Sequence, residues 1–151
     1  MRKSVIICDL DGTLAEVEHR KHFINQEEKD WKSFHEHCVH DEPYKQVVDT
    51  VQALCQIHDL EVYIYTGRTI DTLEVTKNWL ENVGIFYSKI RMRTNEKFWI
   101  KDDQLKENWL NEDFPGNEKD YVYLVLEDRK SVVDMWRRNG LKCFEVNEGN
   151  F

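Results

Sequence analysis

The chain has 151 residues and a formal net charge of −8; 40% of its residues are hydrophobic and 33% are charged. This length suits one compact domain, and the composition is that of a soluble globular protein and excludes a disordered chain. The apolar runs are too short to cross a bilayer and the four cysteines are widely spaced, so we expect a cytoplasmic protein without a membrane partner. The negative charge argues against a long groove that tracks phosphates, but it is compatible with a pocket for one terminal nucleotide.

The first predicted element is a strand over Val5–Cys8, which leads directly into Asp9-Leu10-Asp11-Gly12-Thr13. A short apolar run that ends at a turn indicates a strand buried on both faces of a parallel sheet. Asp9 and Asp11 lie so close that their charges repel, and a cation such as Mg²⁺, which prefers oxygen ligands, would relieve that repulsion. The alternative is a strand end and an Asp-Gly turn whose acids are simply solvated.

Residues 15–42 form a polar, acidic insert that we expect to hold one or two short helices, anchored by Phe23, Trp31 and Phe34. The insert contains five of the six histidines, at positions 19, 22, 35, 37 and 40. A zinc site over residues 35–40 is disfavoured because adjacent ligands on so short a segment cannot easily surround a metal tetrahedrally. Solvated or hydrogen-bonded histidines are the preferred interpretation, and contact with a substrate is the other.

From residue 44 onward, predicted helices alternate with predicted strands. Apolar spacing of three and four residues predicts helices over 44–57, 71–83 and 103–110, and a fourth helix that begins after Ser131, its expected cap, and closes at 139–140. Runs rich in β-branched and aromatic residues predict strands over 61–65, 90–92, 121–126 and 142–146. The alternation predicts one α/β domain, with a parallel sheet covered by helices on both faces.

Three of the predicted strands end in polar residues that can carry chemistry: Asp9 with Asp11, Thr66-Gly67-Arg68, and Glu127-Asp128. Ligands bind beyond the carboxyl ends of the strands in such sheets, so we expect these stretches to meet at one rim. Taken singly, Thr66-Gly67-Arg68 could be an ordinary turn and Glu127-Asp128 a solvated strand end. Their shared position at strand ends favours a site.

This set of residues could transfer a phosphoryl group through a covalent intermediate on an aspartate. Asp9 would attack phosphorus, and Asp11 would act as acid and base for the leaving oxygen. Asp128, with Glu127 beside it, would complete the shell of a metal that reduces repulsion between Asp9 and an anionic substrate. Thr66 and a lysine would hold the phosphoryl oxygens.

The same residues resemble the haloacid dehalogenase (HAD) superfamily, whose phosphatases depend on Mg²⁺. Asp9-Leu10-Asp11-Gly12-Thr13 resembles its first motif, Thr66 its second and Glu127-Asp128 its acidic fourth. A narrower resemblance, to the 3′-phosphatase domain of phage-type polynucleotide kinase-phosphatase, runs over nearly the whole chain but is weak in residues 15–42. It is carried by residues 65–68, 101–106, 127–138, 140–146 and 149–151, and Met135-Trp136-Arg137-Arg138 points to the narrower family.

The resemblance implies a HAD-type Rossmann-like parallel sheet, with residues 15–42 as a small cap over the active site. It implies that Asp9 is the nucleophile and Asp11 the acid and base, with Mg²⁺ bound by Asp9, the Asp11 backbone carbonyl and Asp128. Relatives often carry aspartate where this chain has Glu127, so a longer side chain would reach the metal differently, through water for example, and its role as a ligand stays open.

The resemblance also implies a set of residues that bind the phosphate and the rest of the substrate: Thr66, Gly67, Arg68, Lys106 and Arg93. Lys101 competes with Lys106 for the role of the phosphate-binding lysine. Lys106 is preferred because its spacing after Asp102-Asp103 matches the family.

The expected function is removal of 3′-phosphates from nucleic-acid ends or nucleotides. One alternative is a nucleotidase for free mononucleotides, which the net charge of −8 favours; others are an inactive regulatory or binding subunit of this fold and phosphoryl transfer to an alcohol. The sequence has no Gly-x-x-x-x-Gly-Lys-Ser/Thr phosphate loop, so we expect no kinase activity from this chain, as a free-standing phosphatase or as a subunit of a split repair system. A homo-oligomer is compatible with the sequence.

The aromatic residues divide into expected core residues and possible contacts for a base. Trp79, Trp99, Trp109 and Trp136 fall within or beside amphipathic patterns and are expected in the core. Trp31 in the insert, or the Phe98-Trp99 pair in a loop, is the alternative for stacking on a nucleobase.

Overall fold

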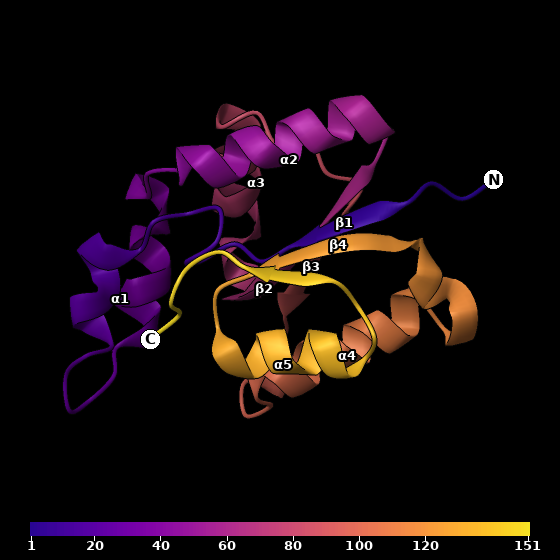
Figure 1. The fold of residues 1–151 in the computed structure, drawn as a ribbon. Helices are drawn as coiled ribbons and strands as arrows, with labels where there is room; N and C mark the ends of the chain where they lie inside the picture. The colour runs from indigo at the N-terminus through magenta and orange to yellow at the C-terminus, as the bar shows by residue number, and fades with distance from the viewer.

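The computed structural model describes residues 1–151 and contains a five-stranded parallel sheet with helices on both faces (Figure 1). The strands follow the order β3-β2-β1-β4-β5, so β1 is central. Their bounds are β1 Val5–Cys8, β2 Glu61–Thr69, β3 Lys89–Arg93, β4 Val122–Glu127 and β5 Cys143–Glu145. Every pairing between neighbouring strands is parallel, as the alternation of helices and strands predicts.

The helices form two layers around the sheet, with α2 and α3 on one face and α4 and α5 on the other (Figure 1). The α-helices are α1 Trp31–Glu36, α2 Lys45–His58, α3 Leu73–Asn82, α4 Asp102–Asp113 and α5 Lys130–Arg138. Short 3₁₀ helices cover Glu18–Phe23, His37–His40, Ile70–Thr72, Asn95–Lys97 and Gly116–Tyr121. The predicted α/β architecture is confirmed. None of the helices combines the length and the apolar character needed to span a bilayer.

Strand β1 connects the two layers of the core. Val5 and Ile7 pack in the cluster that includes α4 and α5, whereas Ile6 and Cys8 pack in the cluster that includes α2 and α3. All four side chains are fully buried, which confirms a strand buried on both faces. Burial of a large aliphatic side chain contributes about 1.5–3 kcal/mol, so both layers hold β1 in place and fix the residues that follow it.

Several boundaries differ from the prediction because side chains from other parts of the chain complete the elements. Strand β2 continues through the predicted turn to Thr69, since Thr69 still pairs with Arg93 of β3. Helix α5 begins at Lys130 with Arg129 at its N-cap, so the expectation that Ser131 is the cap is wrong. The side chain of Glu127 accepts hydrogen bonds from the backbone N–H groups of Asp128 and Arg129, next to the start of this helix.

The insert over residues 15–42 contains α1 and two of the 3₁₀ helices, and it lies beyond the carboxyl ends of the strands (Figure 1). It has a small apolar cluster of its own, built by Val17, Ile24 and Phe34. Phe23 and Phe151 pack against this cluster. The far end of the chain therefore helps to hold the insert next to the sheet.

Three of the four tryptophans expected in the core, Trp79, Trp109 and Trp136, are buried there. The expectation is wrong for Trp99, whose surface is 70% exposed in the loop between β3 and α4. Trp99 lies in this loop, outside any helix that could turn it toward the core.

Candidate active site

The three central strands end at one rim, and their last residues line a shared cavity of about 550 Å³. This volume is within the range of about 300–1,000 Å³ that is common for small-molecule sites. The lining comes from the strand ends, from the insert, from the loop between β3 and α4, and from the end of the chain. It includes Asp9, Asp11, Thr66, Gly67, Arg68, Arg93, Lys101, Asp102, Glu127 and Asp128.

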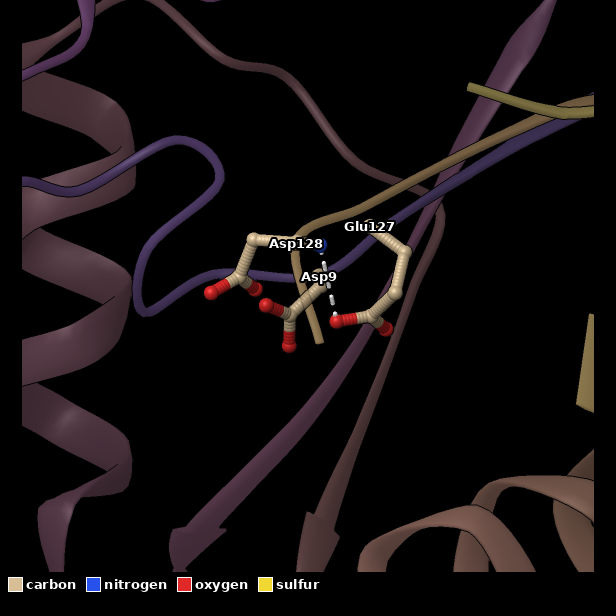
Figure 2. Close-up of side chains that lie close together, drawn as sticks. All are labelled: Asp9, Glu127 and Asp128. Atoms are coloured by element: carbon tan, nitrogen blue, oxygen red, sulfur yellow. Dashed lines mark hydrogen bonds between the residues drawn. The ribbon is translucent and has the colours of Figure 1, made fainter. Parts of the chain in front are cut away.

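Carboxylates from β1 and β4 gather at this rim. Asp9 follows β1, Glu127 ends β4 and Asp128 follows it; carboxylate oxygens of the three lie within 4.8 Å of one another (Figure 2). All three residues are buried, with 6% or less of their surface exposed. Burial, followed by repulsion from Asp9, raises the pKa of both Glu127 and Asp128. The cluster therefore favours a cation in its midst.

Lys106 supplies one such positive charge from α4. Its Nζ donates to Asp9 Oδ1 at 2.7 Å and to Glu127 Oε2 at 2.9 Å, and the side chain is 1% exposed. Burial opposes its charge, but the attraction of Asp9 and Glu127 outweighs burial and raises the pKa of Lys106. Lys101 also lines the cavity, but it is exposed at the N-cap of α4. Lys106 is thus the lysine that touches Asp9.

Both oxygens of Glu127 are already engaged by the protein. Oε1 accepts from the backbone N–H groups of Asp128 at 3.1 Å and Arg129 at 3.3 Å, and Oε2 accepts from Lys106. These contacts hold Glu127 as a support for Lys106 and for the turn after β4.

The Gly12-Thr13 turn closes tightly on Asp128. Gly12 has a φ of +83°, and a Cβ there would lie 2.2 Å from Asp128 Oδ2, so glycine is required by both backbone and space. The Oγ1 of Thr13 lies 3.1 Å from both Asp9 Oδ2 and Asp128 Oδ1. The turn therefore fixes the separation of the two carboxylates.

Asp11 belongs to a different network, made of two arginines and a second aspartate. Its Oδ1 accepts from Nη2 of Arg68 at 2.6 Å and from Nη2 of Arg20 at 2.7 Å. The same two Nη2 groups donate to Asp41 Oδ2, at 3.0 Å from Arg68 and 2.6 Å from Arg20. The side chains of Arg20, Arg68 and Asp41 are all 0% exposed. Four charges thus form a closed ring beside the acidic cluster, with only the Asp11 side chain partly exposed.

Sequence reasoning did not find Arg20 and Asp41. Both lie in the polar insert, where no apolar periodicity marks them and where charged residues are common. Asp41 is further tied to the domain by its backbone oxygen, which accepts from Trp79 Nε1 of α3 at 2.8 Å. The one available signal was an arginine and an aspartate within a segment expected to approach the site.

The ring sets the protonation of Asp11. Burial acts to raise the pKa of this carboxyl, but the positive charges of Arg68 and then Arg20 outweigh burial and hold the pKa well below its usual range. His35, which also lines the cavity and is partly buried, has its pKa lowered, chiefly because its charged form loses water there. A neutral imidazole and an ionised Asp11 therefore line the same cavity near neutral pH.

Residues of β2 and β3 complete the rim. Thr66 is buried, with its Oγ1 accepting from the backbone N–H of Arg68 at 3.2 Å. Gly67 has no side chain to clash with Asp102, whose Oδ1 would lie 2.5 Å from a Cβ at this position. Arg93 lines the cavity, but its guanidinium donates to Asp102 Oδ1 at 3.0 Å and to two backbone oxygens of the next loop. Arg93 is therefore committed to holding that loop.

The donor chemistry of the acidic cluster fits a divalent metal. Three buried carboxylates face one ammonium group, so the local charge remains negative in a region that water does not screen well. Carboxylate and carbonyl oxygens are the ligands that Mg²⁺ prefers. The carboxylate of Asp11 is occupied by arginines, which leaves Asp9 and Asp128 as the freest donors in the group.

Comparison with known proteins shows the family to which the chain belongs. Residues 3–151 match the family described as "Polynucleotide kinase PNKP phosphatase domain". A solved structure of the Pnkp1/Rnl/Hen1 RNA repair complex is similar with a TM-score of 0.80 and 30% identity, over 99% of this chain and 44% of that chain. A protein of Autographa californica nuclear polyhedrosis virus, provisionally named a bifunctional polynucleotide kinase/RNA ligase, is 31% identical over 133 residues, which is 87% of this chain and 17% of that protein.

A more distant likeness concerns the fold alone. A hydrolase from Streptococcus pneumoniae TIGR4 aligns with a TM-score of 0.60 and 15% identity, over 96% of this chain and 93% of that one. The chain thus spans less than half the length of the two more similar proteins but nearly the whole of this one.

Proposed function

The chain belongs to the family of the polynucleotide kinase PNKP phosphatase domain and is a HAD-type phosphatase, and from this we propose that it removes 3′-phosphates from nucleic-acid ends. The observation that carries the proposal is the position of Asp9, held between Lys106 and two further buried carboxylates at the rim of the sheet. An isolated buried carboxylate would be strongly disfavoured, whereas one that must approach an anionic phosphoryl group needs this cationic support.

In the proposed mechanism a carboxylate oxygen of Asp9 attacks phosphorus and the bond from phosphorus to the leaving alcohol oxygen breaks. Asp11, which must be protonated in the complex with substrate, donates that proton to the leaving oxygen. Water then attacks the phosphorus of the aspartyl phosphate, Asp11 takes the proton, and inorganic phosphate leaves as Asp9 is regenerated. Thr66, Gly67 and Lys106 are proposed to hold the phosphoryl oxygens through these steps.

Asp9, Asp128 and the backbone carbonyl of Asp11 would hold Mg²⁺. The ion, when bound, would offset repulsion between the Asp9 carboxylate and the phosphate. We assign Glu127 an indirect part, because both of its oxygens are engaged by Lys106 and by backbone N–H groups. Glu127 then orients Lys106, which acts on the substrate.

Residues 15–42 are proposed to act as a small cap. Trp31, Phe34 and His35 of the insert line the same cavity as Asp9, and Arg20 reaches from the insert to Asp11. A segment that both covers the cavity and supplies a charge to the ring can exclude water and orient Asp11.

The proposal for the substrate draws on the relatives. The names of the two more similar proteins refer to RNA repair and to an RNA ligase, so we place this phosphatase in the repair of RNA ends, alongside a ligase. The competing candidate is a nucleotidase for free mononucleotides. It is favoured by the net charge of −8, which offers no general attraction for a long polyanion.

The test is a substrate profile of the purified chain with Mg²⁺. Phosphate release would be compared for a 3′-phosphorylated RNA oligonucleotide, the matching DNA, and 3′- and 5′-mononucleotides. The proposal expects the oligonucleotides to have the highest kcat/KM, and turnover of mononucleotides alone would replace it with the nucleotidase. In parallel, Asp9→Asn should lower kcat by about 10⁴-fold or more, as loss of a nucleophile does; retained activity would remove Asp9 from that role.

A further inference from the structure

We propose that Phe98 and Trp99, together with Trp31, form a stacking site for a nucleobase at the mouth of the active-site cavity. The inference rests on the proposed function and names the part of the substrate that this phosphatase recognises besides the phosphate. It also gives a role to three aromatic side chains that the core does not use.

The three rings are unusually open for residues of their kind. Phe98 is 77% exposed, Trp99 is 70% exposed and Trp31 is 44% exposed. All three line the same cavity as Asp9. Exposed large apolar groups gathered at a functional cavity indicate a binding surface, because scattered exposure would not place them together.

The loop that carries Phe98 and Trp99 is held in place from beneath. Nη1 of Arg93 donates to the backbone oxygen of Lys97 at 2.7 Å and to that of Ile100 at 2.6 Å. The indole Nε1 of Trp99 donates to the oxygen of Glu96 at 3.1 Å. The indole N–H is thus satisfied within the loop, while the ring remains open to a ligand. Arg93 is the positioning residue for this platform.

A nucleobase is the ligand that suits such a platform. Every base has a π-face, so stacking needs no hydrogen-bond partners, and none of these rings offers a free polar group except the Trp31 indole. Lys101 and Arg129 line the same cavity and could neutralise a neighbouring phosphate. Because the chain is acidic overall, affinity for a nucleic-acid end must come from a few local contacts, and stacking supplies one that is independent of charge.

The experiment compares Trp99→Ala, Phe98→Ala and Trp31→Ala on two 3′-phosphorylated dinucleotides, one normal and one whose terminal nucleotide lacks its base. We expect kcat/KM to fall about 5- to 100-fold on the normal substrate and less than about twofold on the abasic one. Trp99→Phe should retain most of the activity. Phe86→Ala, at an 83% exposed aromatic outside the cavity, is the matched control and should change neither.

Equal losses on both dinucleotides would overturn the inference, since they would show a structural role. Unchanged kinetics would also overturn the inference and would favour contact of these rings with a protein partner. If the wild-type enzyme released phosphate from neither dinucleotide and from no 3′-phosphorylated oligonucleotide, the proposed function would fail, and binding would decide the stacking site. The normal dinucleotide 3′-phosphate should then quench the tryptophan fluorescence of Asp9→Asn more than the abasic dinucleotide does. This difference should be lost when Trp31→Phe and Trp99→Phe are added. Equal quenching by the two dinucleotides would refute the site.

Discussion

Nη2 of Arg68 lies 2.6 Å from Oδ1 of Asp11, and Nε of the same guanidinium lies 3.0 Å from that oxygen. Arg68 has no exposed side-chain surface, so water does not weaken the interaction. The contact joins the carboxyl end of β2 to the turn after β1 and keeps Asp11 ionised against the effect of burial. A substrate phosphate that attracts Arg68 would return the pKa of Asp11 toward its usual range and increase the fraction of Asp11 that carries a proton to donate.

The first prediction concerns Arg68→Gln. Arg68 favours the charged form of Asp11, so its loss lets the carboxyl keep a proton to higher pH. Because Asp11 must be protonated to serve the leaving oxygen, the basic limb of kcat/KM should move upward. Activity near neutral pH should also fall by about 100-fold or more, because a buried cation beside the site of phosphoryl transfer is lost. Profiles of kcat/KM between pH 4 and 9 would test both effects. A basic limb that stayed in place would show that Asp11 does not control it.

The buried ring predicts strong coupling between Arg20 and Asp41. Arg20→Gln and Asp41→Asn should each lower the free energy of unfolding by about 3–5 kcal/mol, because each leaves a buried charge without its partner. The double variant should be less destabilised than the sum of the two, by about 1–3 kcal/mol. Urea unfolding would measure the cycle. Lys45→Gln, which removes one partner of an exposed ion pair, is the control and should cost less than about 1 kcal/mol. Additive effects of Arg20→Gln and Asp41→Asn would argue against coupling in the ring.

Glu127→Gln tests whether Glu127 acts through Lys106. The amide keeps the shape but removes the charge that orients the ammonium group, so we expect kcat to fall about 10- to 100-fold while Mg²⁺ affinity changes little. Asp128→Asn should instead weaken Mg²⁺ binding directly. Titration of activity with Mg²⁺ separates the two outcomes. If Glu127→Gln raised the Mg²⁺ requirement as much as Asp128→Asn, Glu127 would be a direct ligand.

The fold could be predicted from the sequence because the apolar periodicities are strong and alternate cleanly. The strand ends carrying Asp9, Thr66 and Glu127 could be found for the same reason, since a parallel sheet brings such ends to one rim. Arg20 and Asp41 could not be found, because their pairing depends on how the insert folds back over β1. The exposure of Trp99 could not be predicted, because spacing alone cannot tell a helix face from a loop whose backbone is held by the Arg93 side chain.

Asp113, at the far end of α4, predicts a stability effect separate from the active site. Its side chain is 2% exposed and accepts from Lys89 Nζ at 2.8 Å and from the Tyr65 hydroxyl at 2.7 Å, as well as from Arg91. Burial acts to raise its pKa, but these hydrogen bonds outweigh burial and lower the pKa. Asp113 therefore stabilises the fold above the unfolded pKa of about 3.9, and this stabilisation is lost as pH falls through the lower folded value.

Asp113→Asn should accordingly lower the free energy of unfolding by about 2–3 kcal/mol at pH 7 and by less near pH 3. Thermal melts across this range would measure the difference, with phosphatase activity at pH 7 unchanged below the melting temperature. Asp49→Asn, which removes an exposed partner of Lys45, is the matched control and should have little effect at either pH. A loss of the same size at both pH values would contradict the assignment.

The last prediction concerns metal removal. Chelation should abolish phosphatase activity, and added Mg²⁺ should restore it. Chelation should also lower the melting temperature, because Asp9, Glu127 and Asp128 then repel one another without a divalent ion. Asp128→Asn removes one of the repelling charges. The chelated variant should therefore melt at or above the temperature of the chelated wild type, while it loses most of its activity and its thermal response to Mg²⁺.

Protons compete with the metal for these carboxylates, and the pKa values of Glu127 and Asp128 are raised. The stabilisation of the wild type by Mg²⁺ should therefore be larger at pH 8 than at pH 5.5. Differential scanning calorimetry at several Mg²⁺ concentrations would measure these shifts. A chelated wild type that melted no lower than the Mg²⁺-loaded protein at pH 8 would show that Lys106 alone balances the acidic cluster, and the metal would have to act elsewhere.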